Sequence, residues 1–203
     1  MKTLLVIGCG ALSHELASLH QLQQWTHVRI RCLPASLHNR PEQIPEAVRM
    51  AIQLGRSEYD AIFVAYGDCG TGGRLDQVLV EEGVARLPGA HCYAFYAGVD
   101  QFNALAEAEP GTFYLTDFLV RHFARLVLEE LGIRQHPELR SVYFGQYKRV
   151  VWLRQSNDIA LRQQAEQAAA SLGLPLCEYS TGLGELAQSV IRFVETQPMT
   201  VRG

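Results

Sequence analysis

The sequence predicts an α/β protein in which a mostly parallel sheet carries helices on both faces, in a Rossmann-like doubly wound architecture. Short apolar runs alternate with longer segments of helical periodicity along the chain, a pattern typical of β-α-β units. The 203 residues are enough for one well-packed domain, and 48% hydrophobic with 19% charged residues is ordinary for a globular protein. We therefore predict a single domain over residues 1–203, with two α/β halves and a weak boundary near residues 132–140 as the alternative.

In the first half, apolar runs predict strands and the intervening segments predict helices. The expected strands cover residues 3–8, 28–33, 60–66 and 85–88. The expected helices cover residues 12–25, 41–55 and 75–82. Leu12, Leu16 and Leu19 recur at helical spacing, and Pro41 suits the first turn of a helix because that turn needs no amide donor from it.

The second half repeats this rhythm more loosely. The expected strands cover residues 112–115, 148–153 and 175–179, and the expected helices cover residues 100–108, 118–131, 158–172 and a last segment from 183. Gly132 suits the end of the longest of these helices, because glycine is the usual residue just past a helix C-terminus.

Composition and charge exclude several classes of partner. The formal net charge is −3 and no long basic run occurs, so we expect no nucleic-acid partner. No apolar stretch approaches the length of a membrane span, so we expect no membrane partner. The five cysteines form an odd set without a CxxC pair. Such a set is typical of a reducing compartment and predicts a cytoplasmic location.

Cysteines follow three of the strand-like runs. Cys9, Cys69 and Cys92 stand at these ends, with His91 beside the last. Because the carboxyl ends of parallel strands share one edge where ligands bind, distant thiols can meet there. Thiolates and imidazole are the ligands that zinc and other borderline-soft metals prefer. The sequence therefore predicts a metal site, with zinc as the expected ion, made by Cys9, Cys69, His91 and Cys92; the alternative is that each thiol is a core residue.

Two further histidines stay open as ligands. His14 lies one turn into the first predicted helix, and His38 lies in the loop after the second predicted strand. The alternative for each is a solvated or capping residue. Both His91 and Cys92 can bind one ion only if the chain turns between them, since neighbours in a strand point to opposite faces.

A glycine-rich loop follows the third predicted strand. Gly70, Thr71, Gly72 and Gly73 can bring backbone amides close to an anionic part of a substrate, next to the N-terminus of a helix. Cys69 at such a position can have a lowered pKa, so it is a candidate catalytic residue. The alternative is a tight turn that only requires positive φ angles.

Tyr114, in the predicted strand 112–115, is the second candidate catalytic residue. A nucleotide cofactor is not expected. The segment from Gly8 to Ser13 is similar to a dinucleotide fingerprint, but Ser13 replaces the third glycine and no acidic residue closes the second strand.

Several motifs together resemble one protein family. They are CGALSHEL at 9–16, LHNRPEQI at 37–44, YGDCG at 66–70, HC at 91–92 and PGTFYLT at 110–116. The chain resembles the family that carries the domain of unknown function 1638. The resemblance implies a link to corrinoid-dependent methyl transfer and one-carbon metabolism, with a corrinoid protein or a methyltransferase as partner. Members of this family commonly carry an aspartate between the histidine and the cysteine that stand here as His91 and Cys92.

Three functions remain open at this stage. The first is a metal-binding protein or metal-dependent enzyme, a transferase or hydrolase, acting on a small-molecule substrate. The second is a non-enzymatic accessory or carrier partner of a methyltransferase system. The third is a cofactorless, racemase-like enzyme that uses two cysteines, Cys9 and Cys69.

Overall fold

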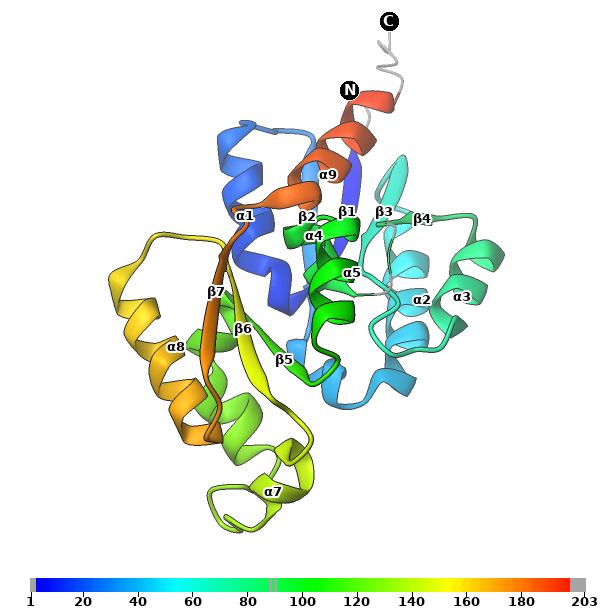
Figure 1. Cartoon of the computed structure of the whole chain (residues 1–203). Coiled ribbons are helices and arrows are strands. Elements are labelled where there is room, and N and C mark those ends of the chain that lie inside the picture. Colours follow the sequence, from blue (N-terminus) through cyan, green and yellow to red (C-terminus); the bar gives the residue numbers. More distant parts are fainter. Residues whose placement is uncertain (1–2, 88, 90, 198–203) are drawn as a thin grey trace, which may run out of the picture. The chain divides into compact units, whose positions relative to one another are not determined.

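The computed structural model describes residues 3–87, 89 and 91–197, and the chain divides into two compact units (Figure 1). The first unit comprises residues 1–95 and 185–203, and the second comprises residues 96–184. Each unit contains its own all-parallel sheet, which confirms the α/β class. The strands form two sheets instead of the one expected, and residues 132–140 lie inside the second unit. A Rossmann-like architecture and the number of independent domains stay predictions.

The first unit carries the elements that build the candidate site. Its strands are β1 (Leu4–Cys9), β2 (Val28–Leu33), β3 (Ala61–Ala65) and β4 (Ala85–Arg86). Its helices are η1 (Gly10–Leu12), α1 (Ser13–Leu22), η2 (Ala35–Asn39), η3 (Pro41–Gln43), α2 (Ile44–Gly55), α3 (Arg74–Glu82) and α9 (Gly184–Thr196), and α4 (Cys92–Ala97) begins at its end.

The sheet of the first unit has the strand order β2-β1-β3-β4. The chain therefore moves outward in one direction from β1 to β2 and then crosses back to β3. Because crossovers between parallel strands are right-handed, α1 and α2 lie on opposite faces of this sheet, as Figure 1 shows. All six residues of β1 are buried, as expected for a strand covered on both faces.

The register of this sheet keeps the strand ends in step. Gly8 of β1 pairs with Cys32 on one side and with Ala65 on the other. Residues that directly follow β1, β2 and β3 therefore lie at one edge of the sheet, the carboxyl edge, where ligands of α/β sheets bind.

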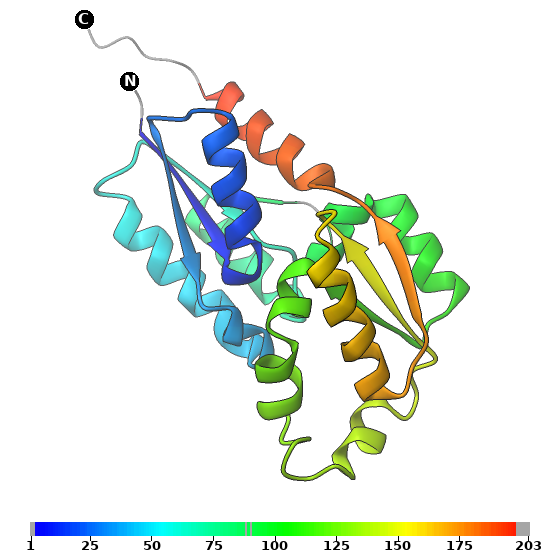
Figure 2. The same ribbon diagram turned by 90° about the vertical axis from the view of Figure 1, so that its left-hand side faces the viewer.

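The second unit has the strand order β5-β6-β7. Its elements are α5 (Val99–Ala108), β5 (Thr112–Thr116), α6 (Asp117–Arg121), the π-helix η4 (Ala124–Glu129), α7 (Leu139–Phe144), β6 (Arg149–Arg154), α8 (Ile159–Leu172) and β7 (Leu176–Ser180). Trp152 of β6 is fully buried in its core, and α8 runs alongside the sheet (Figure 2).

The longest helix expected from the sequence is interrupted. Helix α6 ends at Arg121, and the chain then winds more widely: the amide of Glu130 donates to the carbonyl of Arg125, five residues back, at 3.0 Å. A π-turn of this kind keeps helical periodicity over a short stretch, so the sequence pattern cannot reveal it. Among the described residues, none of the helices combines the length and the apolar character that crossing a membrane requires.

Candidate metal centre

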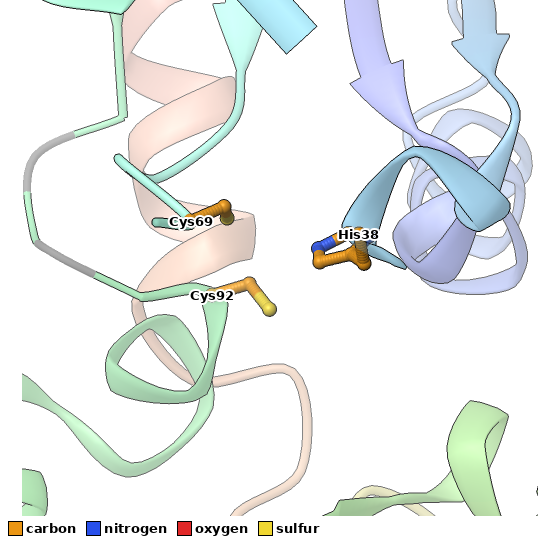
Figure 3. Close-up of side chains that lie close together, drawn as sticks. All are labelled: His38, Cys69 and Cys92. Atoms are coloured by element: carbon orange, nitrogen blue, oxygen red, sulfur yellow. The ribbon is translucent and has the colours of Figure 1, made fainter. Parts of the chain in front are cut away.

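Three side chains with metal-binding chemistry meet at the carboxyl edge of the first sheet. His38 comes from η2, Cys69 from the loop after β3, and Cys92 from the first turn of α4. One ligand atom of each lies within 4.8 Å of the others, and Figure 3 shows the imidazole facing the two thiols. Cys69 and Cys92 are buried, each 8% exposed, and His38 is half-buried. The structure thus brings together two of the four expected ligands and adds a histidine that the sequence had left open.

Cys9 also contacts this imidazole. Its Sγ is 3.6 Å from Nδ1 and 3.9 Å from Nε2 of His38, and it also accepts the backbone amide of Ala11 at 3.2 Å. Cys9 does not belong to the group of three whose ligand atoms lie close together. Its place beside the site agrees with the sequence argument, and its role as a ligand stays a prediction.

The other two candidate histidines lie outside this group. The ring of His91 is exposed and stacks near Tyr93, with 6.1 Å between the ring centroids. His14 is exposed in the first turn of α1. Their roles as ligands stay predictions, and only His38 of the seven histidines in the chain joins the thiols in the part of the chain that the structure describes.

Two glycines allow the segments of the site to approach one another. A Cβ at Gly10 would lie 2.8 Å from the carbonyl oxygen of Leu33 and from the amide nitrogen of Ala35, in the segment that leads to His38. A Cβ at Gly67 would lie 3.1–3.3 Å from backbone atoms of His91 and Cys92. The lack of a side chain at Gly10 and Gly67 is therefore what lets distant parts of the chain place their ligands side by side.

Gly67→Ala is expected to weaken metal binding about 10-fold, because the added methyl group pushes the loop of Cys69 away from Cys92 and disturbs ligand geometry. Titration with a competing chelator measures the affinity. Gly83→Ala is the control: Gly83 also sits where a side chain is unfavourable, at φ +61°, but nothing lies within 4 Å of its added Cβ. Equal affinities in the two variants would contradict the argument.

The loop after β3 holds Cys69 in a rarely used backbone conformation. Cys69 has φ +49° and Gly70 has φ +84°. A non-glycine residue at positive φ costs free energy, and such residues cluster at functional sites. The carboxylate of Asp68 braces this loop, since it accepts Thr71 Oγ1 at 2.5 Å and the amide of Gly73 at 2.8 Å on one oxygen and the amide of Gly72 at 3.0 Å on the other.

This brace bears on the anion site expected at Gly70, Thr71, Gly72 and Gly73. The amides of Gly72 and Gly73, which the sequence argument assigned to a ligand, donate to the chain's own Asp68. The loop therefore has a structural use for these donors, and binding of an anion there stays a prediction.

The segment before Cys92 is also held by hydrogen bonds. Arg86 donates to the carbonyls of Leu87 at 2.6 Å and Gly89 at 2.9 Å, while its guanidinium pairs with Asp76 at 2.6 Å. The amide of Asp68 donates to the same Gly89 carbonyl at 3.3 Å. These contacts tie the two cysteine-bearing segments to each other.

The electrostatics of the group favour a thiolate beside a charged imidazole when no metal is bound. A hydrogen bond from the Cys92 thiol, opposed by burial and aided by His38, lowers the pKa of Cys69 to about 4. Burial works against a charge on His38, but hydrogen bonding with the sulfurs of Cys69 and Cys9 outweighs it and raises the pKa to about 11. The hydrogen bond with Cys69, together with burial, raises the pKa of Cys92. The site thus already holds one thiolate, the form that binds metal.

Tyr66, directly after β3, places a phenol among the thiols. The side chain is fully buried, and its hydroxyl makes no well-aligned hydrogen bond to a described residue. Burial and the neighbouring sulfurs of Cys9, Cys69 and Cys32 raise its pKa, so the group stays protonated. Tyr66 was not a candidate in the sequence argument, because a tyrosine at a strand end looks like any other core aromatic residue.

Tyr114, the other expected catalytic residue, lies on β5 in the second unit. Its ring packs against Phe102 with the centroids 5.0 Å apart, and burial raises its pKa. A catalytic role for Tyr114 stays a prediction.

The family comparison agrees with the motifs. The sequence model of the family described as "Protein of unknown function (DUF1638)" matches residues 32–190, which is 159 of the 203 residues. The fold and the cysteine-histidine group define an α/β protein with a candidate metal centre. The chain belongs to the DUF1638 family. No curated protein and no solved structure matches it.

Proposed function

We propose that this chain is a metal-binding protein that holds one zinc ion with His38, Cys69 and Cys92. The observation that carries the proposal is the meeting of one imidazole and two thiols within 4.8 Å, from three separate segments of the first unit. Zinc bonds of about 2.0 Å to nitrogen and 2.3 Å to sulfur place neighbouring ligand atoms roughly 3.5 Å apart in a tetrahedral site. Small side-chain rotations therefore close the group around an ion.

The contact of His38 with a backbone carbonyl supports this use. Its Nδ1 lies 3.1 Å from the carbonyl oxygen of Ala35, which can accept a proton from that nitrogen. Metal-binding histidines characteristically donate their second nitrogen to a carbonyl or carboxylate, which fixes the ring and leaves Nε2 for the ion. A mixed nitrogen and thiolate set favours zinc over the hard ions magnesium and calcium, which prefer oxygen ligands.

Three protein ligands are the number typical of a catalytic zinc site, where the fourth position receives water or substrate. We therefore favour a metal-dependent enzyme, a transferase or hydrolase acting on a small molecule, over a purely structural ion. A place in one-carbon metabolism, with a corrinoid protein or a methyltransferase as partner, is supported by the family resemblance alone and remains part of the proposal on that basis.

Metal analysis of freshly purified protein, prepared without oxygen and without chelators, tests the proposal. We expect about one equivalent of zinc per chain, because a preformed group of two thiols and one imidazole binds it tightly. Less than about a tenth of an equivalent, after attempted reconstitution with zinc, would contradict the proposal.

A second candidate is thiol chemistry without a metal, since the His38 ring contacts Cys9 and also hydrogen-bonds Cys69. An imidazole beside a cysteine is an arrangement that activates the thiol for nucleophilic or proton-transfer chemistry. In this case the protein as isolated carries no metal, and iodoacetamide at neutral pH modifies Cys69 faster than the exposed Cys177. Slow modification of both Cys9 and Cys69 in metal-free protein would exclude this candidate.

A further inference from the structure

We propose that the fourth position of the metal receives a small exogenous anion, and that the hydroxyl of Tyr66 donates a hydrogen bond to it. This inference rests on the proposed function, since it requires an ion held by His38, Cys69 and Cys92. It assigns a ligand class to the centre, a hydroxide-sized anion bound through one atom, and a positioning role to Tyr66.

The first observation is that the protein supplies three ligand atoms that lie close together, while the sulfur of Cys9, the next candidate ligand, is held by another contact. Cys9 Sγ accepts the amide of Ala11 at 3.2 Å, where it caps the N-terminus of η1, and it does not join the group of three. Gly10, packed against Leu33 and Ala35, fixes the backbone beside it. Movement of Cys9 onto the ion would break this cap and strain a tightly packed strand end.

The second observation is the buried hydroxyl of Tyr66, which has the sulfur of Cys9 as its nearby acceptor. The residue is 0% exposed, and among the described residues nothing forms a well-aligned hydrogen bond with its oxygen. An unpaired buried hydroxyl costs about 1–3 kcal/mol, and a sulfur, which is a weak acceptor, offsets only part of that cost. Tyr66 directly follows β3, so it lies at the same carboxyl edge of the sheet as Cys9 and Cys69, whose sulfurs act on its hydroxyl. A negatively charged ligand on the metal gives this donor a stronger acceptor than the sulfur.

Charge and size define what that ligand is. Two thiolates and a neutral imidazole balance a divalent ion, so one added anion makes the centre negative, and a buried donor such as Tyr66 stabilises that charge. Cys69 and Cys92 are only 8% exposed, which leaves little room at the ion. A small anion that binds through a single atom fits these conditions.

Cobalt(II) provides the test, because its visible absorption reports ligand exchange and its sulfur-to-metal charge-transfer intensity rises with the number of thiolate ligands. Sodium azide is the probe anion. The proteins compared are the wild type, Tyr66→Phe and the control Tyr59→Phe, all as full-length chains. Tyr59 precedes β3 and lies at the opposite, amino end of the strand that Tyr66 follows.

We expect wild type and Tyr59→Phe to bind azide equally, and Tyr66→Phe to bind it about 10-fold more weakly or worse, with unchanged affinity for cobalt. Metal-free Tyr66→Phe should be at least as stable as wild type to urea, since it loses a buried hydroxyl that makes no well-aligned hydrogen bond to a described residue. A purely structural hydroxyl would change stability and leave azide binding unaltered.

Two results would overturn the inference while the proposed function stands. One is equal azide affinity in Tyr66→Phe and wild type. The other is wild-type cobalt protein that ignores azide and loses charge-transfer intensity in Cys9→Ser, which would make Cys9 the fourth ligand. The second result can be recognised even if Tyr66→Phe fails to fold, since it uses only the wild type and Cys9→Ser. Failure of the wild type to bind cobalt or zinc at all would instead refute the proposed function itself, and the inference with it.

Discussion

Cys69→Ser is expected to abolish stoichiometric zinc binding while leaving the fold intact. Cys69 supplies the thiolate of the group, at φ +49° in a loop that Asp68 holds in place. A serine hydroxyl is a poor ligand for zinc and stays protonated near neutral pH, so the site keeps only His38 and Cys92. Mutation of a residue that only hydrogen-bonds a metal ligand costs about 10–100-fold in metal affinity, and loss of a ligand itself costs more. Metal analysis and chelator competition measure the effect.

The matched control is Cys177→Ser. Cys177 is an exposed cysteine on β7 of the second unit, and its pairing partner in the sheet is Val151. This change removes a thiol of the same chemistry and should leave the zinc content at the wild-type value. Full zinc occupancy in Cys69→Ser, with an unchanged circular dichroism spectrum, would refute the proposed set of metal ligands. Loss of zinc in both variants would show that thiol number, not position, determines uptake.

The strands could be predicted because their apolar runs are continuous. Residues 28–33 were expected as a strand and form β2, and the runs at 3–8 and 148–153 differ from β1 and β6 by one residue at each end. A parallel strand covered on both faces has to be apolar along its length, so local sequence reports it well. The carboxyl-edge argument worked for the same reason, since it needs only strand order and direction, and it placed Cys9 and Cys69 at one edge.

The parts that escaped prediction depend on contacts between distant segments. Cys92 was expected at the end of a strand, but β4 is only two residues long and Cys92 begins α4. That helix and the 3-10 turn η2, which presents His38, carry no clear periodic signal. His38, and not His91, lies beside the two thiols, and this depends on tertiary packing such as the close approaches at Gly10 and Gly67. A useful signal was nonetheless present: His38 follows β2, whose end is in register with the ends of β1 and β3.

The division into two sheets also lay outside what local patterns report. Both sheets are parallel and alternate with helices, so the β-α-β rhythm continues from one to the other without a linker. The return of α9 to the first unit is a long-range event, encoded in packing such as the stacking of Phe193 on Phe63, with 4.7 Å between ring centroids. Neighbouring segments therefore cannot reveal which sheet each strand joins.

Asp117→Ala is expected to destabilise the second unit by about 3–4 kcal/mol, the largest effect on stability that we predict. Asp117 is buried, with 2% of the residue exposed. It accepts four hydrogen bonds: from Trp152 Nε1 at 3.0 Å, the amide of Gln155 at 3.1 Å, and the amide and hydroxyl of Ser156 at 2.9 and 2.6 Å. Alanine leaves these donors without an acceptor, and the fully buried indole of Trp152 cannot turn to water.

Asp158→Ala is the comparison that separates this network from an ordinary helix cap. Asp158 is exposed and caps α8 through one hydrogen bond to the amide of Ala160 at 2.8 Å, a contact that contributes about 1 kcal/mol. Urea unfolding followed by Trp152 fluorescence, in a Trp25→Phe background, reports the second unit alone. A loss in Asp117→Ala no larger than that in Asp158→Ala would show that the donors find other acceptors. Asp117→Asn should fall between the two, because its amide retains one acceptor oxygen but turns a donor toward Ser156 or Trp152.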